Sequence, residues 1–160
     1  MQLCDVFLRL GQDGFGQLVR SVSIGKLKTF QLYEGFKASA HLTKLNTETL
    51  RKSAPRFWTR LEQREEEFAK DLGQVILVSH IDMIVSVLDF LCIPHEAGFF
   101  NKNVDARPYL TEGWQDRVYE KFRGVYPEPL VLFYINHLDW ELSGATEPYV
   151  PAAAKGGPGN

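Results

Sequence analysis

The stretch VILVSHIDMIVSVLDFLCI, residues 75–93, decides the fold that we predict for this chain. Its polar residues Ser79, Asp82, Ser86 and Asp89 are spaced by three, four and three, so they share one stripe of a helix. A helix whose other faces are mostly apolar belongs at the centre of a bundle. We therefore predict a buried central helix over about 75–93. A short strand at 75–78 is the alternative, because β-branched runs of this length are ambiguous.

Apolar residues recur at helical spacing through most of the remaining sequence. The further helices that we expect cover about 3–10, 13–22, 26–36, 55–72, 111–124 and 130–142. We place Pro55 in the first turn of its helix, where its missing N–H costs least, and we expect Gly73 to end or bend that helix. The predicted fold class is all-α, with six or seven helices packed like a bundle around the central one.

The predicted domain organisation is one helical domain over 1–144 and a disordered tail over 145–160. A chain of 160 residues is long enough to bury a core as one domain. The tail is rich in Pro, Gly and Ala, a composition that buries little apolar surface.

The composition, with 44 % hydrophobic and 24 % charged residues, is ordinary for a soluble globular protein, and we predict a cytoplasmic location from the features that follow. The cysteines, Cys4 and Cys92, form no CxxC pair, which favours thiols in a reducing compartment. The first residues lack a basic leader, so we expect no secretory signal. The apolar stretch contains His80, Asp82 and Asp89, which are costly in a bilayer, so we expect no membrane segment.

Charge divides the chain into a basic and an acidic part. Residues 1–62 contain ten Lys or Arg and five Asp or Glu, a net charge of +5, and residues 63–160 contain eight and fifteen, a net charge of −7. Such a division favours self-association, or a basic surface that faces an anionic partner.

A candidate basic surface is formed by the cationic residues of the first part. Its members are Arg20, Lys26, Lys28, Lys37, Lys44, Arg51 and Lys52. The turn Ser23-Ile24-Gly25 between two amphipathic helices resembles a DNA-binding helix-turn-helix in outline. However, Arg20, Lys26, Gln31 and Glu34 stand where that motif has apolar packing residues. Nucleic-acid binding is therefore an alternative function, through phosphate contacts rather than sequence-specific ones.

A candidate polar pocket joins two matching triplets, His80-Ile81-Asp82 and His137-Leu138-Asp139. Two imidazoles and two carboxylates could hold a metal or a small molecule, which is a second alternative function. Residues two apart on a helix point about 200° away from each other, so the His and the Asp of one triplet cannot easily bind the same ion. We expect instead that each histidine is hydrogen-bonded within the fold, and we predict no metal and no cofactor.

The loop 94–110 carries a candidate patch, Phe99 and Phe100. Loops of this length are often functional, but we expect both aromatic rings to plug the end of the bundle.

No segment carries an enzyme signature: Gly-x-Ser-x-Gly, a phosphate-binding glycine loop and a nucleophile beside a base are all missing from the sequence. The function that we expect is a non-enzymatic interaction or scaffold domain. Its partner is another protein or a second copy of the chain.

Overall fold

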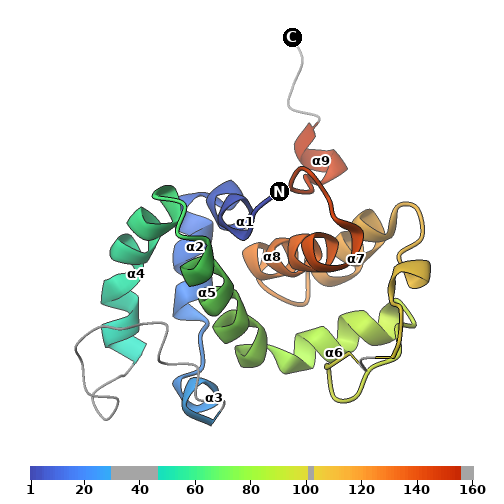
Figure 1. Cartoon of the computed structure of the whole chain (residues 1–160), viewed down its shortest axis with the longest axis horizontal. Coiled ribbons are helices and arrows are strands. Elements are labelled where there is room, and N and C mark those ends of the chain that lie inside the picture. The colour runs from blue at the N-terminus through green and yellow to red at the C-terminus, as the bar shows by residue number, and fades with distance from the viewer. Residues whose placement is uncertain (30–46, 101–102, 156–160) are drawn as a thin grey trace. The chain divides into compact units, whose positions relative to one another are not determined.

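The computed structural model describes residues 1–29, 47–100 and 103–155 (Figure 1). The helices are α1 (Leu3–Arg9), α2 (Gly11–Arg20), α3 (Ile24–Thr29), α4 (Thr47–Glu62), α5 (Glu66–Ser79), α6 (Ile81–Phe90), α7 (Trp114–Phe122), α8 (Glu128–Leu138) and α9 (Ala152–Lys155), with a 3₁₀ turn at Arg107–Tyr109 and a π turn at Asp139–Ser143. Within the described ranges the only strand-type pairing is an isolated bridge between Glu96 and Phe99. The predicted all-α class is confirmed.

The chain divides into two compact units. The N-terminal unit is Gln2–Ile81, and the C-terminal unit is Asp82–Asn160 together with Met1. The single domain over 1–144 remains a prediction.

The N-terminal unit is built on contacts of α1 with α2, α4 and α5, of α2 with α4, and of α3 with α5. The aromatic rings Phe7, Phe15 and Phe57 are almost fully buried at its core. Phe7 meets Phe15 edge to face, with ring centroids 5.9 Å apart, a geometry that the ring quadrupoles favour. The helices predicted over 3–10 and 13–22 correspond to α1 and α2, each of which presents one apolar stripe.

The start of α1 is fixed by a side chain from α5. Glu66 Oε1 accepts a hydrogen bond of 2.6 Å from the Leu3 N–H, and Oε2 accepts one of 3.1 Å from the Cys4 N–H. Both N–H groups belong to the first turn of α1, where no intrahelical acceptor exists. The carboxylate therefore satisfies two donors and also interacts favourably with the helix dipole.

The predicted central helix over 75–93 is wrong, because the chain leaves the helical conformation at His80 (φ −129°, ψ 38°). The residues around this break are hydrogen-bonded to the end of α2. Ser79 Oγ accepts the Ser23 N–H at 2.9 Å, and His80 Nε2 lies 2.8 Å from Ser21 Oγ. Ser79 and His80 are adjacent polar residues inside the apolar run, and their tertiary hydrogen bonds accompany the break in the helix. The periodicity of the sequence does not reveal these bonds.

The helix predicted over 55–72 also differs from the structure. The chain turns at Arg64, whose φ of 61° is left-handed, so α4 ends at Glu62 and α5 starts at Glu66. Arg64 pairs with Asp5, which fixes the turn against the N-terminal segment. Pro55 lies inside α4 rather than in a first turn, and Gly73 lies inside α5 rather than at its end. Neither residue therefore marks a helix boundary in this fold.

The C-terminal unit is centred on the contact of α7 with α8. Phe90, the last residue of α6, meets Phe122 edge to face at 5.6 Å. Part of the segment predicted as a disordered tail is packed instead. The Tyr149 N–H donates to Asn136 Oδ1 at 2.6 Å, and the Tyr149 hydroxyl donates to Asp116 at 2.5 Å. Tyr149 is thus held through both its backbone and its hydroxyl group.

Candidate functional site between α2 and α4

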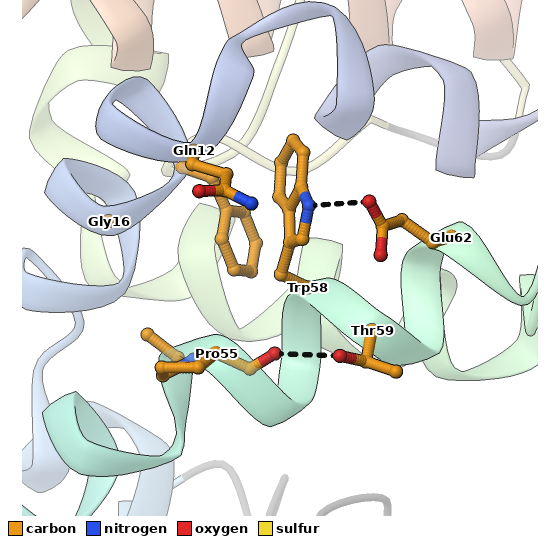
Figure 2. A pocket seen from close by; sticks show the side chains of 8 residues that line it. Gln12, Gly16, Pro55, Trp58, Thr59 and Glu62 are labelled. Atoms are coloured by element: carbon orange, nitrogen blue, oxygen red, sulfur yellow. Dashed lines mark hydrogen bonds between the residues drawn. The ribbon is translucent and has the colours of Figure 1, made fainter.

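A pocket of about 330 Å³ lies between α2 and α4 of the N-terminal unit (Figure 2). Three of the side chains that line it come from α2 and five from α4. They are Gln12, Phe15 and Gly16 on α2, and Ala54, Pro55, Trp58, Thr59 and Glu62 on α4. The volume is at the lower end of the range for ligand pockets, about 300–1,000 Å³, and suits a single large side chain or a small molecule.

The apolar wall of the pocket is aromatic. Phe15 is 2 % exposed, and its ring centroid lies 5.4 Å from that of Trp58. Trp58 itself is half-buried and lines the pocket. The rigid core beneath it, where Phe7 packs on Phe15, holds the indole in place.

The polar rim is ordered by two short hydrogen bonds within α4. Trp58 Nε1–H donates to Glu62 Oε1 at 3.0 Å, and the Thr59 hydroxyl donates to the Pro55 carbonyl at 3.1 Å (Figure 2). Both pairs are four residues apart, which puts their members on the same helix face. Oxygen atoms of Glu62, Thr59 and Pro55 therefore take part in the hydrogen bonds of the rim.

A glycine keeps the α2 side of the pocket open. A Cβ atom built on Gly16 would meet only the guanidinium nitrogens of Arg20, at 3.6 and 4.0 Å. Those are ordinary van der Waals distances to a flexible side chain, so a Cβ at position 16 would cause no clash, and we expect a larger side chain there to occupy pocket space. Gly16 is therefore a natural position at which to block the pocket.

The residues of the candidate basic surface that the structure describes are on the outside of the N-terminal unit. Arg20, Lys26, Arg51 and Lys52 are all exposed. Lys52 forms an i,i+4 ion pair with Glu48, with an N–O distance of 3.1 Å. Lys37 and Lys44 lie outside the described residues. For Lys28 only the helical backbone is described.

His80 is paired within the N-terminal unit, with a hydroxyl group. The Ser21 hydroxyl donates to the Leu18 carbonyl at 2.7 Å, so this network makes His80 Nε2–H the donor to Ser21 Oγ. Burial lowers the pKa of His80, in agreement with a neutral ring. An imidazole that donates to the serine is not placed to remove the serine proton.

The local electrostatics of this pair also oppose nucleophilic catalysis. Ser21 caps the C-terminus of α2, and His80 caps the C-terminus of α5. Helix C-termini carry partial negative charge, whereas an oxyanion needs positively polarised N–H donors. The buried thiol of Cys4 is equally unreactive, because burial and the adjacent Glu66 raise its pKa to about 12.

The other members of the candidate polar pocket belong to the C-terminal unit, in which His137 and Asp139 have separate partners. Asp82 is exposed on α6. His137 Nδ1 lies 3.5 Å from Glu141 Oε2, and burial lowers the pKa of His137 to about 4. Asp139 accepts a hydrogen bond of 3.1 Å from Gln115. Across the described ranges no three His, Cys, Asp or Glu side chains are grouped as metal ligands. A site shared by His80 and His137 remains a prediction.

The prediction that Phe99 and Phe100 plug a bundle end is wrong for Phe99. Its side chain is 52 % exposed, and Phe100 is half-buried. The bridge between Glu96 and Phe99 makes a tight turn, with Gly98 N–H donating to His95 Nδ1 at 3.0 Å. This turn directs the two neighbouring rings into different environments.

Sequence reasoning missed the pocket itself. The periodicity of the sequence does not show that Trp58 and Glu62 share a hydrogen bond, or that both lie beside Gln12. The available signal was the i,i+4 spacing of an amphipathic indole and a carboxylate, with the indole three residues after a proline. The packing of α2 against α4 supplies the rest.

Comparison of the chain with protein-family models, with curated proteins and with solved structures gives no match. In the described ranges no single helix is both long and apolar enough to cross a membrane, and α5 and α6 meet that length and composition only when taken together across their break.

Proposed function

We propose that the chain is a non-enzymatic interaction domain that binds another polypeptide through the pocket between α2 and α4. The observation that carries the proposal is an open pocket of about 330 Å³ with the half-buried Trp58 in its wall. Tryptophan is enriched among the residues that dominate binding energy, because a rigid indole offers a large contact area at small entropic cost. The helix C-termini around Ser21 and His80 support a non-enzymatic role.

A blocking substitution tests the proposal. Leucine at position 16 (Gly16→Leu) fills the pocket without a backbone clash, and Gly124→Leu is the matched control, because a Cβ there meets nothing within 4 Å. Gly124 belongs to the C-terminal unit, away from the lining residues. Each purified protein is immobilised, and the polypeptides that it retains from a cell extract are quantified by mass spectrometry.

The expected result is a set of polypeptides retained by the wild type and by Gly124→Leu but lost with Gly16→Leu. Circular dichroism establishes that both variants keep the helical content of the wild type. Retention of the same set by all three proteins would show that the pocket is not the binding surface.

A second copy of the chain is one form of this partner. The N-terminal unit contains 12 Lys or Arg and 9 Asp or Glu, a net charge of +3, whereas the C-terminal unit contains 6 and 11, a net charge of −5. Opposite charges on two units favour pairing between copies at low ionic strength. Sedimentation should then show a dimer at low salt that dissociates at about 0.5 M salt, where the Debye length is only about 4 Å. If the protein sedimented as a monomer at every salt concentration, self-association would be excluded.

Binding of nucleic acid through the candidate basic surface is the second candidate function. Arg20, Lys26 and Arg51 are exposed, and none forms an ion pair with a described residue. Phosphate contacts of this kind predict a mobility shift that weakens steeply with salt, and an Arg51→Ala variant that binds all sequences more weakly to the same degree. Absence of a shift at low salt excludes this function.

A further inference from the structure

The segment that follows α8 is anchored on α7 and α8 by Tyr149, and all of these residues belong to the C-terminal unit. The Tyr149 main-chain N–H donates to Asn136 Oδ1 on α8 at 2.6 Å. The hydroxyl donates to Asp116 Oδ1 on α7 at 2.5 Å, and the ring meets that of Tyr119 edge to face, with centroids 6.5 Å apart. Two helices thus contact the backbone, the hydroxyl and the ring of one residue.

Asn136 is the buried polar residue of this contact, with only 2 % of its surface exposed. Its Nδ2 donates to the Leu132 carbonyl one turn earlier in α8, at 2.9 Å, which directs Oδ1 toward the segment. Among the residues that the structure describes, the Tyr149 N–H is the partner of that oxygen. A buried carbonyl oxygen without a donor is costly, so this position favours an extended chain that offers a main-chain N–H.

The segment itself is irregular, as a bound peptide would be. Residues 144–151 form neither helix nor strand, and Pro148 and Pro151 disfavour the helical conformation for the residues before them. Pro151 is buried, whereas the stretch that joins the segment to α8 contains the exposed residues Gly144, Thr146 and Glu147. Because this connection is exposed, the anchored part can leave its site while α7 and α8 remain folded.

We propose that this face of α7 and α8 binds an extended, tyrosine-containing segment of a partner polypeptide, and that residues 147–151 occupy the site until such a segment displaces them. The chemistry of the partner follows from the present occupant, which offers a main-chain N–H, an unmodified phenol and a proline two residues later. This surface is separate from the pocket between α2 and α4, and the two can be tested independently. A segment on a short tether has an effective concentration in the millimolar range, about 1 mM or more, so it lowers the apparent affinity for a partner without excluding it.

The probe is a capped peptide with the sequence of residues 145–151, and the receptor is the full chain carrying Tyr149→Ala, which removes the anchor of its own segment. Binding is followed by the backbone ¹H–¹⁵N resonances of Asp116 and Asn136. We expect saturable shifts with a dissociation constant on the order of 1 mM or below. The wild type should bind the peptide at least about fivefold more weakly, because its own segment competes. Equal binding to both proteins, or no shift in Tyr149→Ala, would overturn the inference.

Three changes to the peptide test its contacts one at a time. Phenylalanine in place of the tyrosine removes the hydrogen bond to the Asp116 carboxylate and should weaken binding about tenfold. Methylation of the tyrosine nitrogen removes the donor to Asn136 and should abolish the shifts. Phosphotyrosine places a second anion beside Asp116 and should also abolish them. If all of these peptides bound alike, recognition of the tyrosine would be refuted.

The matched receptor variants are Asp116→Ala and Glu112→Ala, each added to Tyr149→Ala. Both remove one exposed carboxylate near the start of α7. The preference for tyrosine over phenylalanine should disappear with Asp116→Ala, which lacks the acceptor of the hydroxyl, and should remain with Glu112→Ala. The wild type gives a test that needs no variant to fold. At about 10 mM peptide, above the effective concentration of the tethered segment, its Tyr149 amide resonance should shift as the segment is displaced, and an unchanged resonance would overturn the inference.

Discussion

Glu66 should be one of the residues on which the stability of the N-terminal unit depends most, because it caps α1 from a neighbouring helix. The backbone donors that it satisfies belong to Leu3 and Cys4, which are 1 % and 0 % exposed. Glu66→Ala removes both acceptors, and each buried N–H left unsatisfied costs about 1–3 kcal/mol. Loss of the charge at the helix N-terminus adds about 0.3–1 kcal/mol. Because water can reach part of the gap, we expect a total loss of about 3 kcal/mol in the free energy of unfolding.

The measurement is a urea titration followed by the Trp58 indole resonance, which reports on the N-terminal unit because the other tryptophans belong to the C-terminal unit. With a slope of about 1.5 kcal/mol per molar urea, a loss of about 3 kcal/mol lowers the midpoint by about 2 M. Glu66→Gln keeps one carbonyl acceptor, so its midpoint should lie between those of the wild type and Glu66→Ala.

The matched control is Glu67→Ala. Glu67 is next in the chain, but its side chain is exposed and, among the residues that the structure describes, pairs with Lys70 alone, so the loss should stay within about 0.5 kcal/mol. If Glu66→Ala and Glu67→Ala had the same midpoint, the side chain of Glu66 would not be capping α1, and the account of how α1 is held would be refuted.

Two further predictions concern the C-terminal unit. Burial lowers the pKa of His137 from 6.5 to about 4. As the pH falls below 6.5, the unfolded state therefore binds a proton before the folded state does. The contribution of neutral His137 to the free energy of unfolding is full above pH 6.5 and is lost as the pH falls to 4. By urea titration the wild type should therefore lose about 3 kcal/mol more than His137→Gln over that range, and parallel curves would contradict the assignment. Cys92 has a left-handed φ of 58° at the end of α6, where its N–H donates to the Asp89 carbonyl and that of Ile93 donates to the Leu88 carbonyl. Cys92→Gly should raise the free energy of unfolding by about 0.5–1 kcal/mol with no gain for Cys92→Ala, and a gain for both variants would exclude backbone strain as the cause.

The differences between prediction and structure fall at places where a side chain finds a distant partner. Periodicity predicted α1 and α2 correctly, because each is a short amphipathic helix whose apolar residues face its own unit. Periodicity also predicted continuous helices through Arg64 and His80. Arg64 pairs with Asp5, and His80 pairs with Ser21, at sequence separations of 59 residues in both cases. Bonds over such distances leave no trace in a window of 11–18 residues.

The pocket shows the same limit for function. Trp58 and Glu62 are four residues apart on one helix, so their hydrogen bond could have been proposed from the sequence. The proximity of Gln12 and Gly16 to these residues could not have been predicted, because no local sequence pattern indicates that α2 packs against α4. The site residues predicted from the sequence are charged, histidine and aromatic side chains. The pocket also depends on a small residue, Gly16, which leaves space for a ligand.

The sequence by itself determined the all-α class, the apolar faces of the short helices, and the opposite charges of the two parts of the chain. These properties follow from composition and from the 3.6-residue period, which act over one or two turns. Only the tertiary structure decided where the long apolar stretch breaks, which carboxylate caps α1, and which side chains surround the pocket. Each of these depends on hydrogen bonds and packing between segments far apart in the chain, whose free energies exceed the small differences in local helix propensity.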